Sequence, residues 1–144
     1  MGQAIAVACA LAWLAALTIC DVRDRRLPNA LTLPGAAVVL LVAALAGRGP
    51  AALLGAVVLT ALYLVVHLIS PAAMGAGDVK LAIGVGALTG TFGVEAWVLA
   101  ALAAPLLTAT WGIVGLPWRG AGTPVPHGPS MCVATMCAVA LVVA

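Results

Sequence analysis

Charged side chains are scarce in this sequence of 144 residues: 7% are charged, whereas 65% are hydrophobic. A soluble globular domain carries roughly 25% charged residues, so this chain lacks the polar groups that would cover a surface facing water. Its mean hydropathy is +1.26. We therefore expect the chain to lie in a lipid bilayer, where the backbone must satisfy its own hydrogen bonds.

Basic and cysteine-rich motifs are also missing. Six basic and four acidic residues give a formal net charge of only +2, which excludes a basic surface that would attract nucleic acid. The four cysteines include no Cys-x-x-Cys pair, and we interpret them as small buried thiols and not as metal ligands. No metal and no other cofactor is expected, and the expected surroundings are membrane lipid.

What the sequence does contain is a series of long apolar runs separated by short turns. These runs predict an all-α, polytopic integral membrane helical bundle with about six transmembrane helices, forming a single domain over residues 1–144. The fourth run is shorter than the roughly 20 residues of a full crossing, so it could instead merge with the fifth. The runs cover residues 2–20, 30–46, 51–69, 79–90, 92–116 and 129–144.

The basic residues predict the orientation of this bundle, because Lys and Arg accumulate in short cytoplasmic loops. With the N-terminus outside, the first, third and fifth loops face the cytoplasm, and only Arg48 lies on the outer side. The same orientation places Asp21 and Asp78 together on the cytoplasmic side. The basic residues in or beside the cytoplasmic loops are Arg23, Arg25, Arg26, Lys80 and Arg119.

Each acid in a membrane chain needs an explanation, because a charged side chain at the centre of a membrane helix costs about 2.5 to 3.5 kcal/mol on insertion scales. Asp24 lies among arginines and is interpreted as a solvated local ion pair, and Glu95 as an interfacial side chain. Asp21 closes the first apolar run, where an ordinary interfacial acid is one interpretation. Asp78 follows Gly75-Ala76-Gly77, and a glycine-rich turn with an aspartate helix cap is the structural alternative there.

Two segments have local structural interpretations. Pro28 stops the preceding helix, and Asn29 is expected to cap the next one at its N-terminus. The segment 116–129, rich in proline and glycine, is predicted to be the longest irregular segment and a candidate cover.

Two carboxylates brought together at one membrane face form a chemical unit. They do not both ionise cheaply, so one keeps a proton while the other activates water. That arrangement hydrolyses a peptide bond without a metal or a covalent intermediate. Asp78 is predicted at a helix N-terminus and Asp21 near a helix C-terminus, and this difference favours Asp78 as the base.

Three sequence elements together resemble the type IV prepilin peptidase family of membrane aspartic proteases. They are Asp21 with Pro28-Asn29, then Gly75-Ala76-Gly77-Asp78-Val79-Lys80-Leu81, and then Pro126-His127-Gly128-Pro129. The resemblance implies that Asp21 and Asp78 are the catalytic pair. It also implies a cytoplasmic-face endopeptidase, in a bacterial or archaeal inner membrane, that removes the basic leader of prepilin-like proteins. The residues expected to bind substrate or shape the site are Pro28, Asn29, Gly75, Gly77, Lys80, Pro126, Gly128 and Pro129.

The sequence departs from that family's pattern in two respects. Larger members carry an N-terminal extension with cysteine pairs and also methylate the new N-terminus; this sequence begins directly with an apolar run, so methyl transfer is not expected. His127 stands where the family more often has an aromatic residue, which predicts a different contact in the last loop.

Two other classes of protein remain open from the residues alone. Paired membrane acids also serve proton-coupled transporters and channel subunits, although there they lie near the bilayer midplane. A membrane assembly subunit without catalytic activity is the second alternative, and it would tolerate the loss of both acids.

Overall fold

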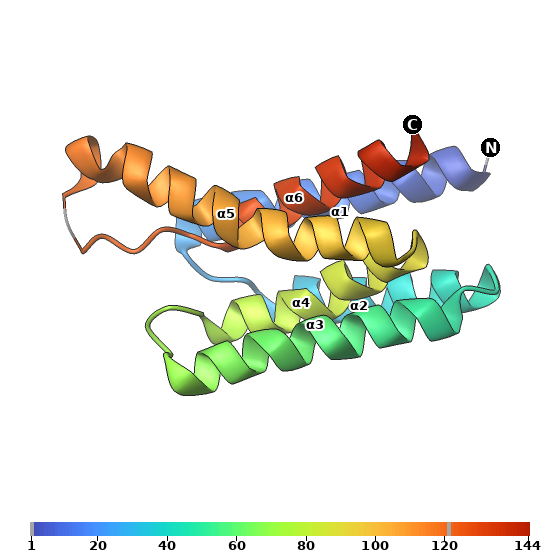
Figure 1. Ribbon diagram of the computed structural model, residues 1–144. Helices are drawn as coiled ribbons and strands as arrows, with labels where there is room; N and C mark the ends of the chain where they lie inside the picture. Colours follow the sequence, from blue (N-terminus) through green and yellow to red (C-terminus); the bar gives the residue numbers. More distant parts are fainter. Residues whose placement is uncertain (1, 121) are drawn as a thin grey trace.

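The computed structural model describes residues 2–120 and 122–144, and these residues form six α-helices (Figure 1). The predicted all-α bundle is confirmed. The helices are α1 (Gly2–Asp24), α2 (Asn29–Leu45), α3 (Gly49–Ile69), α4 (Ala76–Thr91), α5 (Val94–Arg119) and α6 (Gly128–Val143).

Helix ends differ from the predicted runs where they matter for the polar residues. α1 continues past Cys20 to Asp24, so Asp21 lies within its last turn. α5 continues to Arg119, so the irregular segment before α6 begins at residue 120 and not at 116. α4 ends at Thr91 and does not merge with α5, because Gly93 has a φ of 109° that breaks the helix.

The helices form two layers, with α1, α5 and α6 on one side and α2, α3 and α4 on the other (Figure 1). α4 lies at the centre and contacts α2, α3, α5 and α6. The loops after α1, α3 and α5 all lie at one end of the bundle, as the same figure shows. The positions just before and after these loops are therefore brought close together in space.

Three helices are long and apolar enough to cross a membrane: α1 over Ile5–Asp24, α3 and α5. α2 and α6 are apolar but shorter, with 17 and 16 residues. Large apolar side chains cover the outside of the bundle, for example Leu54 at 65% exposure and Ile113 at 69%. Such an exterior suits lipid and not water. The number of helices is thus as predicted, but among the described residues three helices have the length and apolar character of a full span.

Several hydroxyl groups inside the helices are satisfied locally, whereas the buried hydroxyls of Thr60 and Ser130 have no partner among the described residues. The hydroxyls of Thr18, Thr89 and Thr135 each donate to the carbonyl four residues earlier, at 2.7 to 2.8 Å. This bond hides a hydroxyl in apolar surroundings without a partner on another helix. The cysteines are free, and Cys132 is buried as predicted, but that prediction is wrong for Cys9 and Cys137, which are exposed on the apolar exterior.

Small residues allow α4 to pack closely against α3. A methyl group added at Gly86 would meet the Gly55 carbonyl oxygen at 2.5 Å, and one added at Gly90 would meet the Ala51 carbonyl oxygen at 2.7 Å. The spacing of these two glycines, four residues apart, is typical of close helix packing in membranes. Larger side chains would push α4, and with it Asp78, away from α3.

We expect Gly86→Ala to destabilise the protein by about 1 to 3 kcal/mol, because the new methyl group meets backbone that must shift. Gly112→Ala on α5 is the matched control: its methyl group would lie 3.5 Å from Val125, an ordinary contact. Thermal unfolding in detergent micelles compares the two variants with the wild type. Equal melting temperatures for all three would contradict this account of the α3–α4 contact.

Candidate active site

Asp21 is a buried carboxylate at the end of α1, with 7% of its surface exposed. Its Oδ2 accepts a hydrogen bond from the backbone N–H of Gly128, the first residue of α6, at 3.0 Å. The positive end of the α6 dipole and this donor both favour the ionised carboxylate. Residues from the two ends of the chain thus meet at one polar contact.

The C-terminal end of α1 is built around Arg25. The Arg25 N–H donates to the Asp21 carbonyl at 3.0 Å, and Arg25 has a φ of 49°, the left-handed conformation common after a helix. The Pro28 carbonyl then accepts the first hydrogen bonds of α2, from Leu31 and Thr32 at 3.0 Å. The chain therefore turns sharply just after Asp24 and starts α2 at Asn29.

Asp78 lies in the first turn of α4 and is half-buried. Its Oδ2 accepts a hydrogen bond from the Gly75 N–H at 3.2 Å, so it does cap its own helix. Gly77 faces Leu27, and a methyl group there would meet the Leu27 Cβ at 3.3 Å. The absence of a side chain at Gly77 lets the loop after α1 approach the start of α4.

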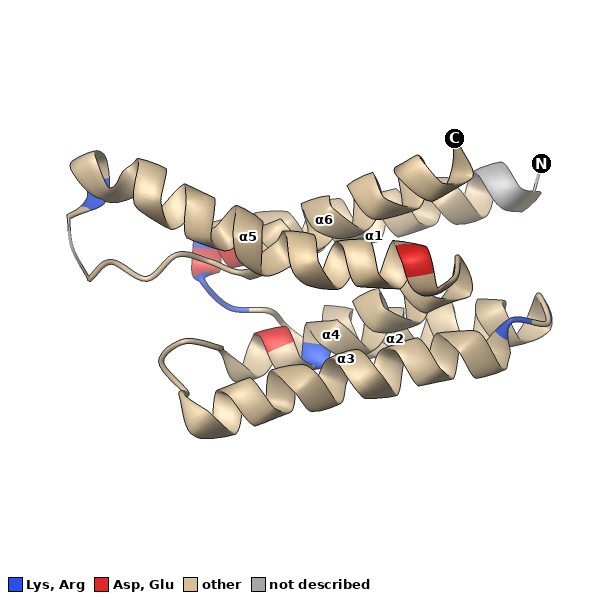
Figure 2. Ribbon diagram, viewed as in Figure 1, with Lys and Arg blue, Asp and Glu red and all other residues tan. Residues whose placement is uncertain are grey.

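The two acids face the same open cavity of about 320 Å³. Arg25, Arg26 and Lys80 line it as well, and Asp21 and Asp78 are within electrostatic range of each other. Figure 2 shows acidic positions on α1 and α4 at the same end of the bundle, while the acid on α5 lies at the opposite end. The structure thus brings together the two aspartates that the sequence singled out.

Asn29 does not cap α2, so that interpretation is wrong. Pro28 occupies the cap position, and no side chain there bonds the helix end. The Asn29 Oδ1 instead accepts a hydrogen bond from the Lys80 Nζ at 2.9 Å, which ties the start of α2 to the first turns of α4. Lys80 is thereby held beside the cavity, two residues past Asp78.

The loop between α5 and α6 reaches the site through its last residues. Gly128 and Pro129 are buried, and a methyl group at Gly128 would meet the Asp21 Oδ2 at 2.5 Å. Pro126 is half-buried one residue before His127. Further back in the loop, the Arg25 Nη1 donates to the Pro124 carbonyl at 3.5 Å. Among the residues expected to shape the site, Gly128 hydrogen-bonds an acid on another helix.

Four residues support the site without having been predicted to. Leu27 packs against Gly77. His67 is held by its Nδ1 on the Met74 carbonyl at 2.7 Å, which fixes the loop before Gly75. Tyr63 and Thr108 both contact His127, at 3.2 and 2.6 Å. The signal for Tyr63 was its rarity, since it is the single tyrosine of the chain; Thr108 left no signal in the sequence.

His127 is half-buried among these neighbours, and burial lowers the pKa of its imidazole. The ring is therefore neutral at neutral pH. Its two nitrogens are both occupied by hydroxyl partners, which leaves no free nitrogen to bind a metal or substrate.

The placement of Asp21 removes the difference between the acids that the sequence suggested. Asp78 lies at the N-terminus of α4, as predicted, but Asp21, although near the end of α1, also lies at the N-terminus of α6. Each carboxylate accepts one backbone N–H at a helix start. The helix ends therefore do not favour one of them as the base.

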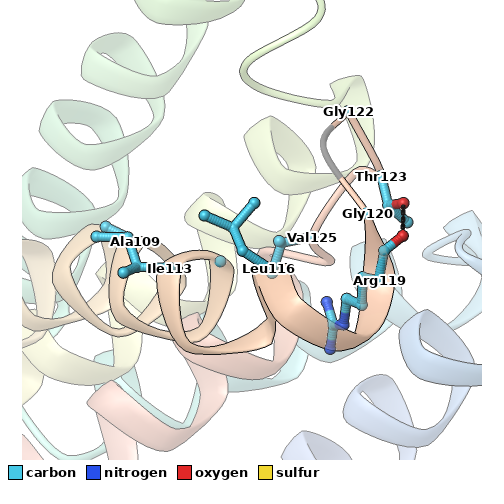
Figure 3. A pocket seen from close by; sticks show the side chains of 9 residues that line it. Ala109, Ile113, Leu116, Arg119, Gly120, Gly122, Thr123 and Val125 are labelled. Carbon is cyan, nitrogen blue, oxygen red and sulfur yellow. Dashed lines mark hydrogen bonds between the residues drawn. The ribbon is translucent and has the colours of Figure 1, made fainter.

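A second cavity, of about 290 Å³, lies between the end of α5 and the following loop (Figure 3). Apolar residues such as Ile113, Leu116 and Val125 line it, together with Arg119, which stacks over Trp111 at 5.5 Å. None of the residues that line this cavity is an acid. The candidate active site is therefore the cavity that Asp21 and Asp78 line.

Comparison with known proteins identifies the family. The sequence model of the type IV leader peptidase family matches residues 8–113, more than half of the chain, including Asp21 and Asp78 but not Gly128. No curated protein and no solved structure matches the chain. With its three helices long enough to cross a bilayer, the chain is a membrane protein that belongs to the type IV leader peptidase family and is thus a peptidase.

Proposed function

We propose that this protein is a membrane aspartic endopeptidase that removes the leader peptide of prepilin-like precursors. One observation carries the proposal: Asp21 and Asp78, from helices far apart in the sequence, line one cavity. The peptidase domain comprises residues 1–144, with the acid end of the bundle facing the cytoplasm. The membrane is the inner membrane of a bacterial or archaeal cell.

The two carboxylates divide the work of hydrolysis. One keeps a proton and the other is ionised, since two close carboxylates do not both ionise cheaply. The ionised carboxylate takes a proton from water as the water oxygen attacks the scissile carbonyl carbon. The protonated carboxyl donates a hydrogen bond to the carbonyl oxygen and so stabilises the negative charge that develops there.

Collapse of the tetrahedral intermediate completes the reaction. The carbonyl re-forms, the carbon–nitrogen bond breaks, and the leaving amine takes the proton that came from water. The products are the leader with a new carboxyl end and the mature protein with a free amine. The backbone donors of Gly75 and Gly128 hold the two acids in place throughout, which keeps their geometry fixed between turnovers.

The charges around the cavity fit an acid pair at an interface. Arg25, Arg26 and Lys80 line the cavity together with the two aspartates. The basic residues of the cavity therefore outnumber its acids, and positive charge lies near each ionised carboxylate. The acids lie at the ends of α1 and α4. A proton relay near the bilayer midplane, as in the transporter alternative, would place them further along the helices.

We expect Asp21→Asn and Asp78→Asn each to lower leader cleavage by about 10² to 10⁴-fold, the usual range for loss of a general acid or base. Cleavage is followed by gel shift after co-expression with a prepilin-like protein from the same source. Asp24→Asn is the matched control, because Asp24 is exposed on the same helix and does not line the cavity.

The outcomes separate the candidate functions. If the wild type cleaves the leader and one of the two cavity variants still cleaves it, the acid changed in that variant is not part of the catalytic pair. Normal membrane insertion of all three variants, checked by fractionation, is needed for a loss of cleavage to count. A wild-type protein that cleaves no prepilin-like protein of its source would favour the transporter or assembly alternatives.

We expect Gly128→Ala to lower kcat for leader cleavage by about 10- to 100-fold, because the methyl group displaces the Asp21 carboxylate and misplaced catalytic groups cost rates of that order. Gly112→Ala, whose new methyl group makes only an ordinary van der Waals contact, is expected to cleave at the wild-type rate. Initial rates with purified protein in detergent make the comparison. Equal activity of the two variants would show that Asp21 does not depend on this contact.

A further inference from the structure

A chain of hydrogen bonds connects α3 and α5 through His127 to the residue beside the acid pair. The Tyr63 hydroxyl lies 3.2 Å from the His127 Nε2, and the Thr108 Oγ1 lies 2.6 Å from the His127 Nδ1. Tyr63 is 8% exposed, and its ring centroid lies 5.7 Å from that of His127. These three side chains come from α3, α5 and the start of α6.

The directions of these hydrogen bonds follow from the donors available. The Thr108 hydroxyl donates to the Ala104 carbonyl at 3.1 Å, so its oxygen is an acceptor for the His127 Nδ1–H. The Nε2 of a neutral imidazole protonated on Nδ1 is an acceptor, and it receives the Tyr63 O–H. In this arrangement the two hydroxyl hydrogens and the imidazole N–H each have an acceptor.

This chain of hydrogen bonds ends at His127, the residue before the glycine that binds the Asp21 carboxylate. His127 is the cap residue of α6, and its carbonyl accepts the Met131 N–H at 3.1 Å. The next residue, Gly128, donates its own N–H to the Asp21 Oδ2. With its ring fixed on one side by Tyr63 and on the other by Thr108, His127 has little freedom to rotate, and neither does the peptide group that joins it to Gly128.

We propose that Tyr63, His127 and Thr108 are positioning residues that hold the Gly128 N–H on the Asp21 carboxylate. The effect of this positioning on catalysis rests on the proposed function, whereas the positioning itself does not. The three side chains act through the backbone of residues 127 and 128. Loss of either hydroxyl leaves a nitrogen of the half-buried imidazole without a partner and frees the ring.

The Gly128 amide can be observed by itself. Of the two histidines, His67 precedes a leucine and His127 precedes a glycine. Protein labelled with ¹³C-carbonyl histidine and ¹⁵N-glycine therefore gives one correlation between a histidine carbonyl and a glycine amide, that of His127 and Gly128. Its hydrogen exchange rate in micelles reports whether this amide is held.

We expect Thr108→Val to speed exchange of the Gly128 amide by about tenfold, and Thr108→Ser, which keeps the hydroxyl, to restore the wild-type rate. Thr110→Val is the matched control, because the exposed Thr110 hydroxyl bonds only within its own helix, to the Leu106 carbonyl. Tyr63→Phe gives a second, milder loss and decides the result if Thr108→Val does not fold. Wild-type exchange rates in both Thr108→Val and Tyr63→Phe would overturn the proposal.

Cleavage assays then test the consequence for catalysis. Thr108→Val is expected to lower kcat by about tenfold with KM within about twofold, because the site is misaligned while substrate binding is kept. Thr108→Ser restores kcat, and Thr110→Val does not change it. Unchanged kcat with faster exchange would overturn the catalytic part alone. If the wild type cleaved no prepilin-like leader, the exchange rates would still decide the structural part.

Discussion

The hydrogen bond from the Gly128 N–H to the Asp21 carboxylate sets a constraint on the whole site. Asp21 is buried in an apolar bundle, and a buried carboxylate is costly unless donors satisfy it. Meeting that need brings the start of α6 to the end of α1 and leaves no room for a side chain at residue 128. The rest of the last loop, with His127 held by two hydroxyls, follows from the need to deliver this one amide.

The second acid depends on a different constraint, the close packing of α4 at the centre of the bundle. Glycines bring the backbones of α3 and α4 together, and Lys80 ties the start of α4 to Asn29 on α2. His67 fixes the loop that precedes Gly75. Packing in a membrane gains little from the hydrophobic effect between helices, so close backbone contact and a few hydrogen bonds have a larger share. Asp78 is held at the cavity by these contacts.

Much of the fold could be predicted from the sequence, because long apolar segments have no alternative to the helix in a bilayer. Continuous apolar runs require helices, and the few acids each needed an explanation, which isolated Asp21 and Asp78 before any contact was known. Two predictions about the site failed because a partner distant in sequence decided the outcome. Asn29 looks like a helix cap, but the Lys80 Nζ bonds it. The helix-end argument for the base overlooked α6, because its N-terminus reaches Asp21 only in three dimensions.

The sequence by itself determined that this is a helical membrane chain with two unexplained acids and glycine-rich turns beside them, because composition and hydrophobic runs act locally along the chain. Only the tertiary structure decided which backbone amide satisfies each acid and which side chains hold those amides. Tyr63 on α3 and Thr108 on α5 are separated by the whole of α4, and His127 lies beyond the end of α5. Their hydrogen bonds exist because helix packing brings three helices together, and no local pattern encodes that meeting.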